Sequence, residues 1–224
     1  MKSPVMDTIE KNKWNFWEEI HTGRKKTDTK IVDMIIKSEG KFKDPYTMID
    51  LPGPAQERSW NTWSRLSEDM RYIAAENNRV HFERMIENNN KLKDKNKIEI
   101  VYGDFFDILK SDTIKTQPLK IIKFCGVQTL GMYHRSGRHG DRITTNLVNS
   151  IAEAAKEEKV ASTYWVILTS ARRNSPIHPE KVLEAIVNMA RAKGLFMYHF
   201  DVVEHGSPRT GEANMRTDIF KGLL

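Results

Sequence analysis

The sequence has little cysteine and lacks any long hydrophobic run. Its 224 residues include one cysteine, Cys125, which excludes an intramolecular disulfide and any zinc site built from several cysteines. No apolar stretch approaches the roughly 20 residues that a membrane-spanning helix needs. The first 13 residues contain no apolar core of a signal peptide. These absences predict a soluble, cytoplasmic protein with no membrane partner.

Basic residues outnumber acidic ones by a small margin. Lys and Arg number 36 and Asp and Glu number 30, which gives a formal charge of +6 and an isoelectric point near 9.3. This balance favours an anionic partner, with nucleic acid first; the alternative is a moderately basic enzyme without such a partner. Mean hydropathy is −0.59, yet five Trp and nine Phe supply core material for one domain.

Short apolar runs alternate with helical patterns along most of the chain. This alternation predicts an α/β fold with a seven-stranded, mostly parallel sheet, helices on both faces and an antiparallel last strand. The expected strands cover residues 46–50, 71–75, 98–102, 119–125, 164–169, 195–203 and 215–220. The expected helices cover residues 56–70, 77–90 and 142–159, and a last one begins at Pro179 and ends at the C-cap candidate Gly194.

The first 44 residues predict an N-terminal helical extension, with the α/β domain over residues 45–224. Trp14 and Trp17 stand three residues apart, as on one helical face, and Thr29 is a candidate N-cap for a second helix. Within the domain, Asp141 is the candidate N-cap of the helix over 142–159.

The first expected strand ends at Asp50 and is followed by a turn that contains Gly53. In an open α/β sheet, ligands bind where the first strand passes into the first helix, so this turn is a hypothesis for a cofactor site. A nicotinamide cofactor is disfavoured, because no Gly-x-Gly-x-x-Gly follows the strand.

Three strand ends carry an acid. Asp50-Leu51-Pro52-Gly53-Pro54 follows the first strand, Glu76 follows the second, and Gly103-Asp104-Phe105-Phe106 follows the third. Over roughly residues 44–224 this arrangement resembles the class I S-adenosylmethionine-dependent methyltransferases, which have a Rossmann-like fold. The resemblance implies an S-adenosylmethionine site formed by Asp50, Leu51, Gly53, Glu76, Asn77, Asp104, Phe105, Cys125 and Gly126. It also implies that Glu76 accepts hydrogen bonds from the ribose hydroxyls.

Two features depart from the pattern of that family. The first turn has one glycine between two prolines, where the family has two or three glycines. The segment from Phe124 to Gln128 lacks the acid or Asn, the two prolines and the aromatic found in enzymes that methylate exocyclic amines of bases. The sequence therefore gives no support to amino methylation by that mechanism.

Candidates for the chemistry follow the fourth and fifth expected strands. Cys125 stands where pyrimidine C5-methyltransferases can have a nucleophile; the alternative is a small buried apolar residue. The exposed loop expected over 127–140 supplies His134 and Arg138 as further catalytic candidates. Substrate-binding candidates, or residues of a solvated basic surface, are Tyr133, Arg135, His139, Arg172 and Arg173. No metal site is expected, since His134 and His139 have no further ligand nearby.

Two functions are therefore open at the level of sequence. The first is an S-adenosylmethionine-dependent methyltransferase that acts on nucleic acid or a nucleotide by direct displacement at the sulfonium. The second is a degenerate member that keeps the fold as a binding module without catalysis, with nucleic acid as its candidate ligand.

Overall fold

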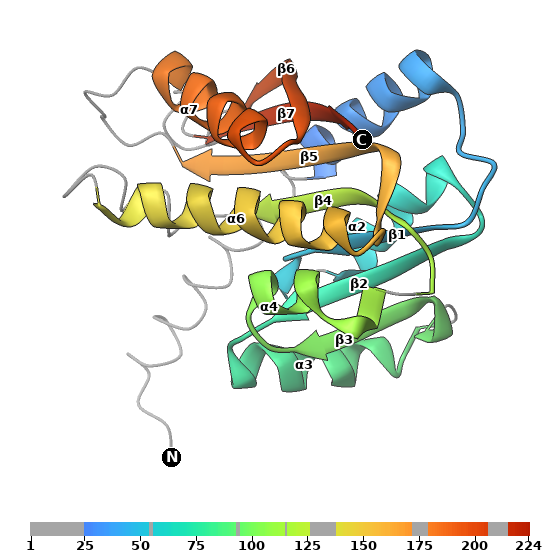
Figure 1. Cartoon of the computed structure of the whole chain (residues 1–224). Coiled ribbons are helices and arrows are strands. Elements are labelled where there is room, and N and C mark those ends of the chain that lie inside the picture. The colour runs from blue at the N-terminus through green and yellow to red at the C-terminus, as the bar shows by residue number, and fades with distance from the viewer. Residues whose placement is uncertain are drawn as a thin grey trace.

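A single seven-stranded sheet forms the centre of the molecule (Figure 1). The structure is a computed structural model and describes residues 25–53, 56–92, 95–114, 116–125, 138–171, 179–205 and 215–224. The strand order is β3-β2-β1-β4-β5-β7-β6. The strands are β1 (Tyr46–Asp50), β2 (Met70–Glu76), β3 (Ile98–Tyr102), β4 (Leu119–Cys125), β5 (Val160–Ala171), β6 (Phe196–His205) and β7 (Met215–Leu223).

The first five strands are parallel to one another, and β7 is antiparallel to both of its neighbours, β5 and β6. This confirms the predicted α/β fold with its antiparallel last strand. β5 runs well beyond the predicted residues 164–169, because β7 pairs with it from Thr163 to Ala171. The crossovers place the carboxyl ends of β1 to β4 at one edge of the sheet.

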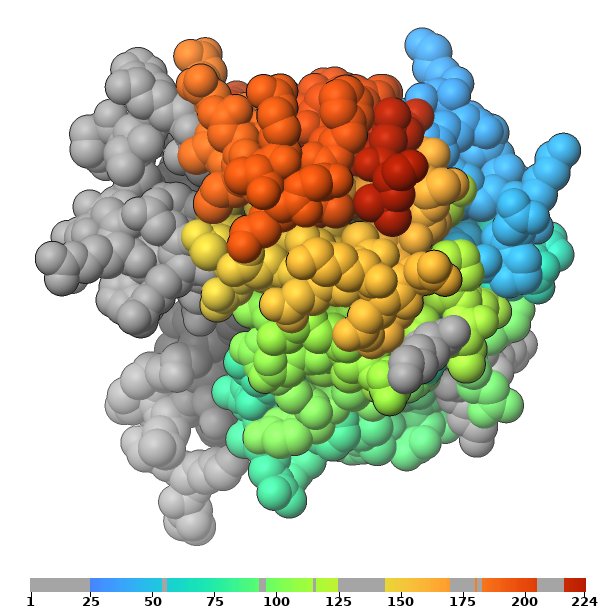
Figure 2. All heavy atoms as spheres, in the orientation of Figure 1, coloured from blue at the N-terminus to red at the C-terminus, as the bar shows by residue number. Residues whose placement is uncertain are grey.

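One face of the sheet is covered by α4 (Phe105–Lys110), α6 (Arg138–Lys156) and α7 (Pro179–Ala192), which Figure 2 shows side by side. Apolar residues of these helices pack on strand residues that alternate along the chain, such as Ile49, Ile122 and Val166. Tyr164 lies in the same cluster, fully buried. This face is an apolar core of the ordinary kind.

The other face is covered by the helix over residues 25–39, α2 (Gln56–Trp63) and α3 (Arg79–Asn89). Ile31, Val32 and Ile35 of the first of these helices are fully buried against the sheet together with Trp63. The described part of the N-terminal extension thus supplies one layer of the core (Figure 1). The predicted helix around Trp14 and Trp17 lies outside the described residues.

Several local predictions were wrong at helix ends. The helix predicted over 56–70 ends at Trp63, with a 3-10 turn to Leu66, because Met70 already belongs to β2. Thr29 is not an N-cap: it lies inside a helix, where its hydroxyl donates to the Lys25 carbonyl at 2.8 Å. Asp141 is likewise inside α6, which begins at Arg138. Gly194, with φ +78°, does follow the end of α7 as predicted.

Candidate cofactor site at the carboxyl ends of the strands

The strand ends predicted to hold a cofactor do meet at one edge of the sheet. Asp50 is paired in register with Ala74 of β2, and Glu76 with Tyr102 of β3. The backbone N–H of Gly103 donates to the carbonyl of Glu76 at 3.0 Å, which holds the segments after β2 and β3 together. The parallel sheet therefore brings Asp50, Glu76 and the start of α4 into one region.

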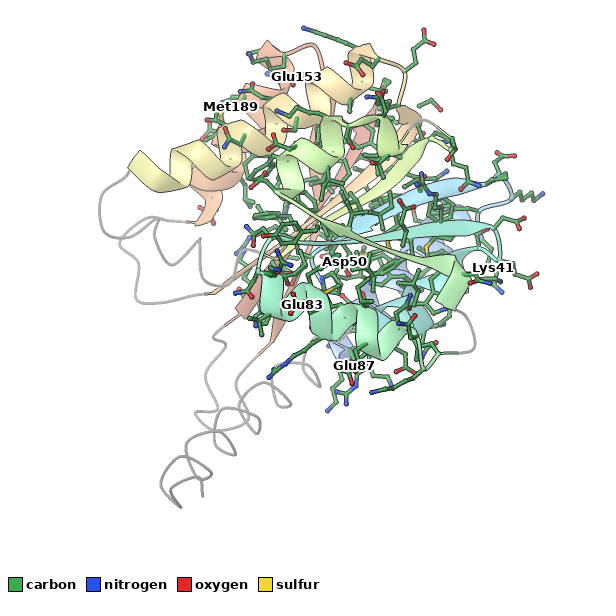
Figure 3. All side chains as sticks on the ribbon, turned by 90° about the horizontal axis from the view of Figure 1, so that it is seen from below. Lys41, Asp50, Glu83, Glu87, Glu153 and Met189 are labelled. Atoms are coloured by element: carbon green, nitrogen blue, oxygen red, sulfur yellow. The ribbon has the colours of Figure 1, made fainter. Side chains whose placement is uncertain are left out.

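Asp50 is fully buried in the centre of the molecule (Figure 3). Its Oδ2 atom accepts three hydrogen bonds: from Ser59 Oγ at 2.6 Å, from Tyr72 Oη at 2.8 Å and from Lys123 Nζ at 3.2 Å. Its Oδ1 atom is also buried and has no hydrogen-bond partner among the residues the structure describes. Half of this carboxylate is thus saturated by the protein, and the other half is left for a further donor.

Lys123 is the cation of this buried cluster. Its ammonium lies 2.8 Å from Oδ2 of Asp28, in the helix over 25–39, and 5.6 Å from the ring centre of Trp63. Burial raises the pKa of the Asp28 carboxyl, and the neighbouring Lys123 ammonium acts against that rise. Burial, reinforced by Asp50, raises the pKa of the Tyr72 hydroxyl well above its usual value and keeps it a proton donor.

Glu76 ends β2 and is 8% exposed. Its Oε1 atom accepts a hydrogen bond from the backbone N–H of Asn78 at 2.8 Å, and its Oε2 atom lies 3.7 Å from Nδ1 of His81. Asn77, which follows Glu76 in the sequence, is exposed. The hydrogen bond from Asn78 holds the Glu76 carboxylate at the end of β2 and occupies only one of its two oxygens.

Asp104 and Phe105 belong to the start of α4, a helix the sequence analysis missed. Asp104 is its N-cap: Oδ1 accepts from the backbone N–H of Phe106 at 2.8 Å. Phe105 is buried, and Phe106 stacks on Phe124 of β4 with ring centres 5.3 Å apart. Asp104 itself is exposed, so one of its carboxylate oxygens caps the helix while the side chain faces solvent.

The turn after β1 is open at its glycine. Gly53 has φ +59°, a left-handed conformation that favours glycine, and a Cβ built there would meet no atom within 4 Å. Leu51 packs against the apolar core beside α4, and Pro52 is buried. There is thus open space beside the backbone of Gly53, and Pro54 lies outside the described residues.

Most of the predicted catalytic and substrate-binding residues lie outside the described part of the chain. These are Tyr133, His134, Arg135, Arg172 and Arg173, and the cofactor-binding candidate Gly126 also lies outside it. Cys125 ends β4 as predicted. Arg138 and His139 were placed in an exposed loop, and that was wrong: both belong to the first turn of α6, whose helix extends further toward the N-terminus than its apolar pattern indicated.

Sequence reasoning missed four residues of the cluster around Asp50. Ser59, Tyr72 and Lys123 donate hydrogen bonds to Asp50, and Asp28 accepts one from Lys123. One signal was present, since Lys123 interrupts the apolar strand Leu119–Cys125, and a charge inside a central strand needs a partner. The identity of that partner is not local in sequence, because Asp28 and Lys123 are 95 residues apart.

The described residues contain neither a metal cluster nor a membrane-spanning helix. Among the described residues, no group of three or more His, Cys, Asp or Glu side chains is placed to hold a metal ion. Within the same ranges, every helix is too short or too polar to cross a membrane.

Comparison with known proteins shows similarity of fold to solved structures and no similarity of sequence to a known family. No family model matches the sequence, and no curated protein matches it. Among solved structures, a putative sarcosine dimethylglycine methyltransferase from Galdieria sulphuraria is similar, with a TM-score of 0.56 and 13% identity, covering 88% of this chain and 85% of that one. A putative RNA methyltransferase from Pyrococcus horikoshii gives 0.54 and 14%, covering 87% and 80%.

The glycopeptide N-methyltransferase MtfA, complexed with sinefungin, gives a TM-score of 0.50 at 11% identity and covers 88% of this chain and 86% of its own. These three likenesses cover 87–88% of this chain at 11–14% identity and show the fold alone. The chain therefore has the fold of the class I S-adenosylmethionine-dependent methyltransferases, in a divergent sequence.

Proposed function

We propose that the protein binds S-adenosylmethionine at the carboxyl ends of β1, β2 and β3 and is a methyltransferase acting on nucleic acid or a nucleotide. The observation that carries this proposal is the Oδ1 atom of Asp50, buried without a partner among the described residues. This oxygen belongs to the last residue of β1, directly before the turn predicted to bind the cofactor, and it can accept a hydrogen bond from a ligand donor there.

The described residues fit the donor groups of this cofactor. S-adenosylmethionine presents two ribose hydroxyls, an adenine amino group and an ammonium, and Asp50, Glu76 and Asp104 each present carboxylate oxygens. The open backbone at Gly53 allows close approach. Bound cofactor supplies a methyl group activated by a cationic sulfonium. The carboxylates of this chain orient the cofactor, so catalysis by the protein is largely a matter of position.

A nucleic-acid or nucleotide substrate is supported by two weaker observations. The net charge of +6 favours an anionic partner. One structure of the same fold is titled a putative RNA methyltransferase, although others of that fold are titled for small molecules or peptides. The substrate-binding residues remain those of the sequence prediction, with Arg172 and Arg173 as phosphate contacts.

The second candidate is a binding module that has lost catalysis. It is favoured by the first turn, where Gly53 is the only glycine and Pro52 removes a backbone donor. It is also favoured by the three protein donors on Oδ2 of Asp50, which already satisfy half of that carboxylate. Cofactor binding separates the two candidates most cheaply.

Isothermal titration with S-adenosylmethionine tests the proposal. The wild-type protein should bind. Glu76→Gln should weaken binding by roughly tenfold, because it replaces the carboxylate proposed to accept hydrogen bonds from the ribose hydroxyls with a neutral amide. Glu83→Gln is the matched control, because Glu83 is an exposed carboxylate on α3, paired with Arg79 at 3.0 Å. A folded wild-type protein that binds neither S-adenosylmethionine nor its demethylated product at millimolar concentration overturns the enzyme proposal.

The nucleic-acid part has its own test. Binding of a short single-stranded RNA should weaken steeply between 50 and 200 mM salt, as expected when phosphate contacts release counterions. Affinity that stays constant across this range argues against a phosphate-contacting surface and leaves the cofactor proposal intact.

A further inference from the structure

The buried cluster on the α2 face holds two acids and one base. Asp28, Asp50 and Lys123 are 6%, 0% and 6% exposed. Lys123 Nζ lies 2.8 Å from Asp28 and 3.2 Å from Asp50, so among the described residues two carboxylates share one ammonium. Buried ions of one sign are usually matched by the other, and here the acids are in excess.

Asp28 is the member of this cluster that the fold does not need for neutrality. Lys123 and Asp50 alone form a neutral pair, which Ser59 and Tyr72 already complete with hydrogen bonds. Burial raises the pKa of the Asp28 carboxyl, with the Asp50 carboxylate adding to the rise and the Lys123 ammonium opposing it. An ionised Asp28 is thus costly to the folded protein, so stability does not account for an acid at this position.

The position of the cluster offers another account. Asp50 is the last residue of β1, and the turn with Gly53 follows it directly. Any excess negative charge on the cluster therefore lies next to the proposed cofactor site. The protein interior and the absence of screening ions make such a charge effective over longer distances than at the surface.

We infer that Asp28 is a specificity-determining residue, which favours cationic S-adenosylmethionine over its neutral demethylated product. This inference rests on the proposed function. The cofactor carries a sulfonium, an ammonium and a carboxylate, hence one net positive charge, and the product has lost the sulfonium charge. A negative charge held at the cluster stabilises the first ligand more than the second. Preference for cofactor over product limits inhibition by the product.

The experiment measures both dissociation constants by titration calorimetry and compares their ratio between variants. Asp28→Asn keeps the shape of the side chain and removes the charge, so the preference for S-adenosylmethionine over product should fall by roughly fourfold. Asp28→Leu, which also lacks the charge, should give the same fall, and Asp28→Glu should keep the wild-type ratio. A general loss of packing weakens both ligands alike and leaves the ratio unchanged.

Asp33→Asn is the matched control. Asp33 lies on the same helix, but its side chain is 54% exposed and pairs with Arg65, so its charge is screened by solvent. Two neutral Asp28 variants that bind both ligands with the wild-type ratio overturn the inference and leave the cofactor proposal standing. An equal change in Asp33→Asn also overturns it. A wild-type protein that binds neither ligand overturns the proposed function itself.

Discussion

The two faces of the sheet are built differently. On the face covered by α4, α6 and α7, the strands present apolar side chains such as Ile49 and Ile122 to apolar helices. On the opposite face, between the helix over 25–39 and α2, the sheet carries the charged side chains of Asp50 and Lys123. Apolar packing is enough to stabilise the first face. The second face places buried charge at the end of β1, where the turn of the proposed cofactor site begins.

The largest expected effect comes from removing the cation of the charged face. Lys123→Met leaves Asp28 and Asp50 buried without their ammonium, and we expect a loss of roughly 3–5 kcal/mol in the free energy of unfolding. Denaturant unfolding followed by circular dichroism measures it. Adding Asp28→Asn to Lys123→Met should recover part of the loss, because one of the two stranded charges is removed.

The exposed Lys156 of α6 provides the control for that experiment. Lys156→Met should change stability by less than about 0.5 kcal/mol. If Lys123→Met costs no more than Lys156→Met, the buried cluster contributes nothing to the fold and the contrast between the faces fails.

The next effect concerns the apolar face. Gly222 of β7 pairs with Tyr164 of β5, and a Cβ at Gly222 would lie 2.1 Å from a carbon of the Tyr164 ring. Tyr164 is fully buried, so its ring cannot move away at low cost. Gly222→Ala should destabilise the protein by about 3 kcal/mol, through overpacking alone.

Because no charge is involved at Gly222, this loss should be the same at pH 5 and pH 8, measured by thermal unfolding. Tyr164→Phe is a useful companion: the ring still blocks the added methyl group, so the double variant should stay destabilised. A stable Gly222→Ala protein would show that the apolar face is looser than the contact distances indicate.

The smallest effect depends on pH and returns to the charged face. The pKa of Asp28 is raised in the folded protein by burial, so the folded state holds this proton more tightly than the unfolded state does. Its stabilising contribution is therefore complete below the unfolded pKa, near 3.8, and is lost as pH rises through the higher folded value. Asp28→Asn should match the wild-type protein near pH 4 and exceed it by roughly 1 kcal/mol at higher pH.

Thermal unfolding across pH 4 to 8 measures this difference. Asp33→Asn, at an exposed position on the same helix, should show little change with pH. A wild-type protein that gains stability relative to Asp28→Asn as pH rises would reverse the assigned sign and show that Lys123 holds Asp28 ionised.

The sheet could be predicted from the sequence because its signals are local. β1, β3 and β4 match their predicted bounds, since each is an apolar run ended by a turn signal. The start of α6 could not be predicted, because Arg138 and His139 resemble loop residues and become helical only in the context of the chain that follows. α4 was missed because it has six residues, too few to show a helical period.

The site was predictable only in part, for a related reason. The acids Asp50 and Glu76 could be placed at one edge, since parallel strands fix where their ends lie. What surrounds Asp50 could not, because the bonds from Tyr72 and Lys123 span 22 and 73 residues. Secondary-structure propensity and hydrophobic periodicity depend on residues that are close in sequence. A buried ion pair joins residues that are far apart in sequence and meet only in the folded protein.

The central claim is that a cofactor occupies the edge formed by Asp50, Glu76 and Gly53. A crystal structure of the protein grown with saturating S-adenosylhomocysteine tests it most directly. The account predicts density for the ligand above Gly53, with a donor on Oδ1 of Asp50 and the ribose hydroxyls on Glu76. A well-ordered protein with only water at Oδ1 of Asp50, and no ligand at the ends of β1 and β2, would contradict the account.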